Sequence, residues 1–335
     1  MSSSSAIWSR VLPVRQSRGN GVHAIDLPNG GGLSELILGG HEYLPDGRSR
    51  AFNEDMARAV TPGVVFPGFG GPGRLAVLRR ALDAGVRAFD VTIDSEKEAL
   101  GRNLRQLGVR DATVQTRPEG MLYGYDPANR KLVTHGLLRA EVRRIIDMMQ
   151  VPRIDILNIG ILRDALDADA AYLSRLADIL DGLKQEGLIG HAAADSFSGA
   201  RCYLAMIACG AFDSININFN LADDRALDEV IPAARARGMR VVAREIYLKG
   251  ELFRIARDLG LPAAQAARAA YKWVLSQPGI DACILGAQDE LQLQASLDAL
   301  ASRRLDSDDL DTLDRLFAAP ALRTLRENNR ARFLL

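Results

Sequence analysis

The sequence has no apolar run of the ~20 residues that a transmembrane helix needs, so we expect no membrane span. It also has no excess of either charge, because Lys+Arg and Asp+Glu both number 42 and the formal net charge is +0. Nucleic acids and membrane surfaces attract proteins through excess positive charge. We therefore expect neither as a partner.

Cysteine is scarce as well. The three cysteines are an odd number and show no metal-type spacing, which favours reduced thiols in a cytoplasmic protein. The N-terminus lacks the basic start and apolar core of a secretion signal. The expected location is therefore the cytoplasm.

Composition is otherwise that of a globular protein, with 47% apolar and 25% charged residues. Residues 1–22 are rich in Ser, Gly and Arg and predict a flexible arm. Residues 23–335 predict a single domain. Residues 41–73 are rich in Gly, Pro and charged residues and show neither the helical nor the strand periodicity. We therefore expect a long functional loop over the active face.

Short β-type runs alternate with amphipathic helical stretches along most of the chain. A hairpin is predicted at 23–40 around Asn29-Gly30. The alternation and its length predict an α/β fold, a (β/α)8 TIM barrel with a C-terminal helix at 308–317. No Gly-x-Gly-x-x-Gly follows the first strand, which argues against a Rossmann domain. The expected strands are 36–39, 86–90, 112–117, 154–159, 191–195, 214–219, 240–245 and 282–285.

Several segments in combination resemble the aldo/keto reductases. They are Phe89-Asp90 with Leu100-Gly101, then 184–190, 243–250 and 284–287. The resemblance covers about residues 23–300. It implies that the N-terminal β-hairpin closes the bottom of the barrel.

The resemblance also implies where reductase groups should lie. The family uses Asp, Tyr, Lys and His, and the Asp matches Asp90. The Lys position holds Arg117 and the His position Gly160, while the segment after Asp90 lacks a tyrosine. Arginine stays cationic but cannot exchange a proton as lysine does. A proton donor of the family type is therefore missing from the expected site.

Family cofactor contacts are altered in the same comparison. The Ser-Asn pair after the fifth strand is matched by Asp195-Ser196, the Gln of the sixth by Asn216, and the stacking aromatic of the seventh by Arg244. The adenosine clamp is matched by 288–296, which contains no cation. A 2′-phosphate would be poorly held there. We therefore expect no cofactor, with NADP or NAD as the weaker alternative.

Charged and polar side chains instead recur at the predicted strand ends, where barrels place their chemistry. We expect an Asp90–Arg117 ion pair that shares one cavity with Glu245. A divalent metal is not expected, because no His-x-His or His-Glu-x-x-His spacing occurs. The catalytic candidates are Asp90, Arg117, Glu245, His41 and Asp195, and the substrate-binding candidates are Glu42, Asp94, Glu119, Tyr123, Asn158, Asn216, Asn218 and Arg244.

Three functions remain open. We favour a non-redox lyase, dehydratase, isomerase or hydrolase that acts on a small polar or anionic substrate through these carboxylates. The alternative is a divergent NAD(P)-dependent carbonyl oxidoreductase whose proton donor is Tyr123, Asp94 or His41. The third is a non-catalytic binding protein. The sequence leaves a homo-oligomer open.

Overall fold

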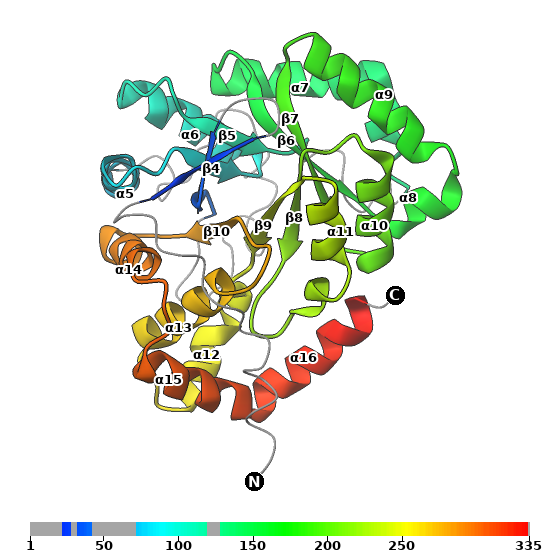
Figure 1. Cartoon of the computed structure of the whole chain (residues 1–335). Coiled ribbons are helices and arrows are strands. Elements are labelled where there is room, and N and C mark those ends of the chain that lie inside the picture. The colour runs from blue at the N-terminus through cyan, green and yellow to red at the C-terminus, as the bar shows by residue number, and fades with distance from the viewer. Residues whose placement is uncertain (1–21, 28–31, 42–71, 119–127, 334–335) are drawn as a thin grey trace.

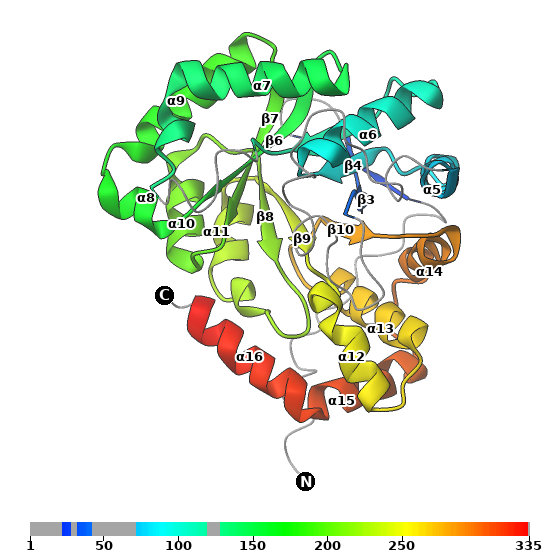
Figure 2. The ribbon, with the colours of Figure 1, turned by 180° about the vertical axis from the view of Figure 1, so that it is seen from behind.

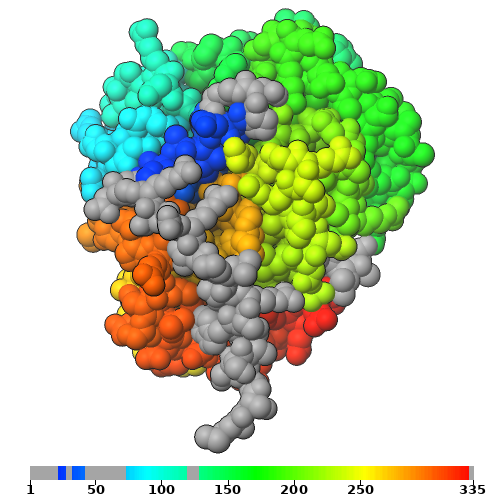
Figure 3. Space-filling view, in the orientation of Figure 1, coloured from blue at the N-terminus to red at the C-terminus, as the bar shows by residue number. Residues whose placement is uncertain are grey.

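A computed structural model describes residues 22–27, 32–41, 72–118 and 128–333. Eight parallel strands close into a barrel, which confirms the predicted fold (Figure 1). The barrel closes where β10 pairs with β3, and the blue N-terminal segment accordingly lies against orange C-terminal residues in Figure 3. Around the barrel the strands are β3 (Leu36–Gly39), β4 (Ala88–Val91), β5 (Thr113–Thr116), β6 (Ile154–Ile161), β7 (Ile189–Ser196), β8 (Ser214–Asn218), β9 (Arg240–Arg244) and β10 (Ala282–Gly286).

Helices form the outer ring of the barrel (Figures 1 and 2). None of the described helices is long and apolar enough to cross a membrane. The helices are α5 (Pro72–Asp83), α6 (Asp94–Gln106), α7 (His135–Met149), α8 (Arg163–Ala168), α9 (Tyr172–Gln185), α10 (Ala200–Cys209), α11 (Val230–Ala236), α12 (Glu251–Asp258), α13 (Ala263–Leu275), α14 (Glu290–Ala301), α15 (Ser307–Ala318) and α16 (Pro320–Phe333), with short 3-10 turns η2 (Arg130–Val133), η3 (Arg225–Leu227) and η4 (Leu248–Gly250).

The hairpin of β1 (Ala24–Asp26) and β2 (Gly32–Ser34) closes the N-terminal end of the barrel, as predicted. Thr113, at the start of β5, donates a hydrogen bond to the Gly32 carbonyl, and Arg240, at the start of β9, donates to that of Asp26. Leu27 and Leu33 pack on inward-facing apolar side chains of the strands. The floor of the barrel is therefore sealed by apolar contacts.

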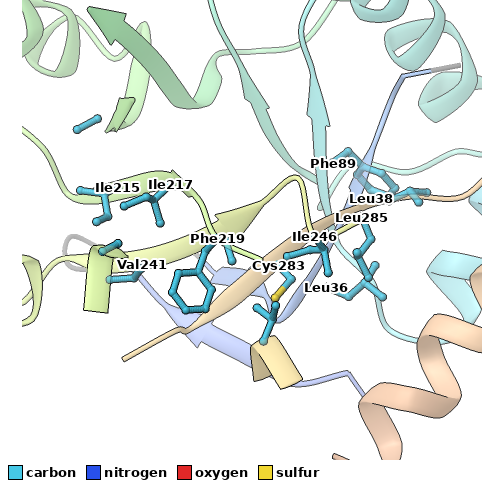
Figure 4. Packing of buried hydrophobic residues seen from close by; sticks show 14 of the residues in the cluster. Leu36, Leu38, Phe89, Ile215, Ile217, Phe219, Val241, Ile246, Cys283 and Leu285 are labelled. Carbon is cyan, nitrogen blue, oxygen red and sulfur yellow. The ribbon is translucent and has the colours of Figure 1, made fainter. Parts of the chain in front are cut away.

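The outward faces of the strands carry most of the core. Side chains two residues apart, such as Leu36 and Leu38 or Ile215 and Ile217, point together toward the helices (Figure 4). This period of two is the alternation of a β-strand. The inward faces remain free for polar side chains above the floor.

Candidate active site

Inward-facing positions change from apolar to polar toward the carboxyl ends of the strands. On β6, Ile156 belongs to the apolar floor and Asn158 is the next inward residue. On β9, Val242 belongs to the floor and Arg244 follows. This end of a parallel barrel is where active sites form.

Asp195 is the hub of the polar layer. It is fully buried, and its two oxygens accept hydrogen bonds from Arg244 at 2.6 Å and Arg117 at 3.3 Å. The side-chain amide of Asn158 donates to the same carboxylate at 3.3 Å. Burial lowers the pKa of Arg244, but Asp195 and its other neighbours outweigh burial and raise it. The structure therefore brings together four predicted site residues, all from strand ends.

Arg244 also lies over the ring of Phe197, 4.6 Å from its centroid. Its Nη1 atom pairs with Glu245 at 3.2 Å, and Glu245 pairs in turn with Lys249 at 3.3 Å. Glu245 has a φ of 59°, in the left-handed region that non-glycine residues rarely adopt. Backbone strain of this kind gathers at ligand sites.

Asp90 has a different partner from the one predicted. Its carboxylate accepts a hydrogen bond from Gln115 at 2.8 Å, whereas Arg117 bonds to Asp195. Among the described residues no ion pair joins Asp90 to Arg117. Burial raises the pKa of Asp90, and the Arg117 charge offsets only part of that rise. The direct Asp90–Arg117 pair was therefore wrong, because neighbouring strands place Gln115 opposite Asp90.

His41 lies at the end of β3, and its Nδ1 atom contacts Glu96 Oε1 at 2.5 Å. Glu96 is in the first turn of α6 and also accepts hydrogen bonds from the backbone N–H groups of Thr92 and Ile93. Glu96 therefore caps the N–H groups at the start of the helix through its own carboxylate. Glu96 was not among the site residues predicted from the sequence.

Asp94 does not join the Asp195 cluster. Its carboxylate accepts hydrogen bonds from Arg144 of α7 at 2.8 Å and from Lys97 of α6 at 3.2 Å. Asp94 therefore connects two outer helices. The prediction that it binds substrate is replaced by this structural role. Glu42, Glu119 and Tyr123 lie outside the described residues.

Tyr203 of α10 was missed from the sequence because it follows a strand rather than ending one. Its hydroxyl donates to the Asn216 carbonyl at 2.8 Å and lies 3.3 Å from Asp195. Burial, and then the Asp195 charge, raise the pKa of Tyr203 far above the usual phenol range. Tyr203 is therefore a poor proton donor.

A cavity of about 210 Å³ opens beside this cluster, between the ends of β7, β8 and β9 and helix α16. Asn218 and Glu245 line it from the strands, and Leu325 and Asn329 line it from α16. Arg326 of α16 forms an ion pair with Asp224, in the loop after β8, at 2.8 Å. The sequence predicted a single C-terminal helix, so this wall of the cavity was not foreseen.

Asn216 lies on β8, one inward position below Asn218. It is 0% exposed, and among the described residues neither its Nδ2 nor its Oδ1 atom has a hydrogen-bond partner. Buried polar atoms are normally paired, so an unpaired carboxamide points to a missing ligand. Within the same part of the chain, no group of three His, Cys, Asp or Glu side chains could hold a metal ion.

Comparison with known proteins agrees with this architecture. The model of the aldo/keto reductase family matches residues 72–254. A solved glycerol dehydrogenase from Gluconobacter oxydans superposes with a TM-score of 0.60 and 19% identity, over 88% of this chain and 95% of its own. No curated protein matches significantly.

The family match overturns two predictions, the non-redox chemistry and the absence of a cofactor. The first rested on the absent tyrosine and on Arg117 and Gly160 at the Lys and His positions. The second rested on the altered cofactor contacts, including Arg244 and the cation-free segment 288–296. The match spans the altered catalytic positions, and a barrel can supply donors from other strand ends. Because the match covers more than half of the sequence, this chain belongs to the aldo/keto reductase family.

Proposed function

We propose that this protein is an NAD(P)-dependent oxidoreductase that interconverts a small carbonyl compound and its alcohol. Family membership supports this reaction class. A fold alone does not fix a function, so the proposal needs a feature of this site. That feature is the unpaired carboxamide of Asn216.

The Asn216 side chain fits a nicotinamide. A buried donor or acceptor without a partner costs about 1–3 kcal/mol, and Asn216 has one of each. The carboxamide of nicotinamide also has one donor and one acceptor face, so the two amides satisfy each other. The family resemblance places its amide-binding glutamine at this same strand.

Other residues would hold the remainder of the cofactor. Asn218, two residues after Asn216 on β8, lines the cavity together with Glu245, Leu248, Lys249 and Glu251. When bound, the nicotinamide supplies or accepts the hydride. Arg117 is the cation whose charge acts on both Asp90 and His41, and it would stabilise negative charge on the substrate oxygen.

The segment after β10 favours NAD(H) over NADP(H). From Ala287 to Ser302 there is no Lys or Arg. Helix α14 begins instead with the Asp289 cap, whose carboxylate accepts the Gln292 N–H, followed by Glu290. The segment itself offers a 2′-phosphate acidic groups, and Arg80, which reaches it from α5, already donates a hydrogen bond to Gln294 at 3.1 Å.

Turnover of the cofactor tests the proposed function. We expect purified protein to oxidise NADH in the presence of glyceraldehyde, dihydroxyacetone or methylglyoxal, and to reduce NAD with glycerol, the substrate named for the solved neighbour. The measurement is NADH absorbance at several substrate concentrations, with NADPH and NADP in parallel. Absence of turnover with every carbonyl and alcohol, for both cofactors, would contradict the proposal.

A further inference from the structure

One ionisable pair at the barrel mouth has no role in the cofactor contacts above. His41 Nδ1 and Glu96 Oε1 are 2.5 Å apart, and the imidazole is 28% exposed while the carboxylate is 1% exposed. Two backbone N–H groups fix the other oxygen of Glu96. The pair therefore combines a buried, oriented carboxylate with a partly accessible imidazole.

Gly40 brings the pair to the end of β4. Its N–H donates to the Asp90 carbonyl at 2.8 Å, and a Cβ at this position would lie 2.7 Å from Val91 Cγ1. Only glycine permits this approach without a shift of Val91. The close approach seats His41 beside the strand that carries Asp90.

The charged groups around His41 come from four neighbouring segments. Glu96 is on α6 and Asp90 on β4, Arg117 follows β5, and Arg74 on α5 acts on Glu96. Burial lowers the pKa of His41, but Glu96 and then Asp90 outweigh burial and Arg117, and the pKa is raised overall. Burial raises the pKa of Glu96, but His41 and the two backbone N–H donors outweigh burial, so the pKa of Glu96 is lowered overall. The stable form is thus imidazolium next to carboxylate.

We propose that His41 is the proton donor of the reaction, with Glu96 as its positioning residue. This inference rests on the proposed function. In reduction, the carbonyl carbon receives a hydride from reduced nicotinamide, and the carbonyl oxygen takes the proton from Nε2 of His41. The products are an alcohol, oxidised nicotinamide and neutral imidazole, which regains a proton from water. Oxidation of the alcohol runs through the same steps in reverse.

Other described donors fit this role less well. Asp94 is bound by Arg144 and Lys97, and Tyr203 is buried with its hydroxyl on a backbone carbonyl. Asp90 is held by Gln115. His41 combines a proton on the imidazole, whose pKa is raised by Glu96, with partial exposure at the mouth.

The test compares His41→Gln and Glu96→Gln with wild type, and His135→Gln on α7 is the matched control. We expect the NADH-dependent reduction rate of wild type to fall as pH rises through the His41 pKa. His41→Gln should lose this falling limb of the pH–rate profile. Its kcat should decrease about 10²–10⁴-fold, with NADH affinity retained. Glu96→Gln should move the limb to lower pH, because the carboxylate that raises the His41 pKa is gone.

Histidine NMR of the same proteins measures the titration directly. The His41 resonance should titrate above 6.5 in wild type and lower in Glu96→Gln. Retention of rate and pH limb in His41→Gln would overturn the role of His41 while leaving the oxidoreductase function intact. If wild type neither binds nor oxidises NADH, the proposed function fails, and the donor role fails with it.

Discussion

Asp195 shows how the barrel mouth tolerates a buried charge. Its carboxylate has no exposure and lies between two guanidinium groups that are themselves 9% and 10% exposed. Removal of one partner from a buried ion pair costs about 3–5 kcal/mol, so this arrangement requires all three charges. The groups are held in place before any ligand arrives, which is the condition for electrostatic preorganisation.

Asp94 provides a prediction about pH. Burial raises its pKa, but Arg144 and Lys97 lower it to below the usual 3.8. A carboxyl with a depressed folded pKa stabilises the native state above its unfolded pKa, and this contribution is lost as pH falls through the folded value. We expect Asp94→Asn to reduce the free energy of unfolding by roughly 1–2 kcal/mol at neutral pH. Urea unfolding at several pH values should show the difference shrinking below pH 3.8.

The matched control is Asp111→Asn, which removes an exposed ion pair with Arg87. Exposed pairs contribute little to stability, so this variant should unfold like wild type at every pH. An Asp94→Asn variant that is as stable as wild type at neutral pH would show that its two cations do not stabilise the fold.

Part of the site was predictable residue by residue. Strand ends indicated Asp195, Arg117 and Arg244, because the carboxyl ends of all parallel strands meet at one mouth. Which charges pair could not be read from the sequence, since this depends on the stagger between strands. Gln115 was missed for that reason. Glu96 was missed because nothing in the sequence distinguishes a glutamate that only caps a helix from one that also pairs with a histidine.

Gly101 of α6 lies directly against the backbone of α7. A Cβ at Gly101 would lie 2.2 Å from the Met149 carbonyl oxygen, a backbone atom that cannot move aside. We expect Gly101→Ala to destabilise the protein by about 1–3 kcal/mol or more, because overpacking separates the two helices. Denaturant unfolding with circular dichroism measures the change.

Gly136, in the first turn of α7, is the control for this substitution. Nothing lies within 4 Å of a Cβ built there, so Gly136→Ala should not destabilise the protein. Equal stability of Gly101→Ala and wild type would show that α6 and α7 are less closely packed than described.

Each predicted strand lies within two residues of the observed strand at both ends. The predicted 36–39 and 214–219 differ from β3 and β8 by at most one residue at either end. After β8 the chain forms the short η3 and then α11. Pro232 lies in the first turn of α11, where a missing N–H is tolerated. Helix α16 begins at Pro320, a helix-start signal that the sequence interpretation did not use.

At the scale of the whole molecule, the barrel separates two tasks. The hairpin and the inward apolar residues seal the floor, so chemistry is confined to the mouth. The β7–β9 side holds Asn216 and the cavity under α16, whereas the β3–β4 side holds His41 and Glu96. Arg117 is linked to both sides, through Asp195 and through its charge on Asp90. This division suits a cofactor on one side and a proton donor on the other.

Calorimetric titration of NADH tests the central claim most directly, because it requires no substrate. Wild type should bind NADH saturably and NADPH more weakly, since 287–302 lacks a cation. Asn216→Ala should weaken NADH binding about tenfold or more, for loss of two buried hydrogen bonds. Asn328→Ala, an exposed position on α16, should bind like wild type. Absence of saturable binding of either cofactor to wild type, or equal NADH affinity of wild type and Asn216→Ala, would contradict the account.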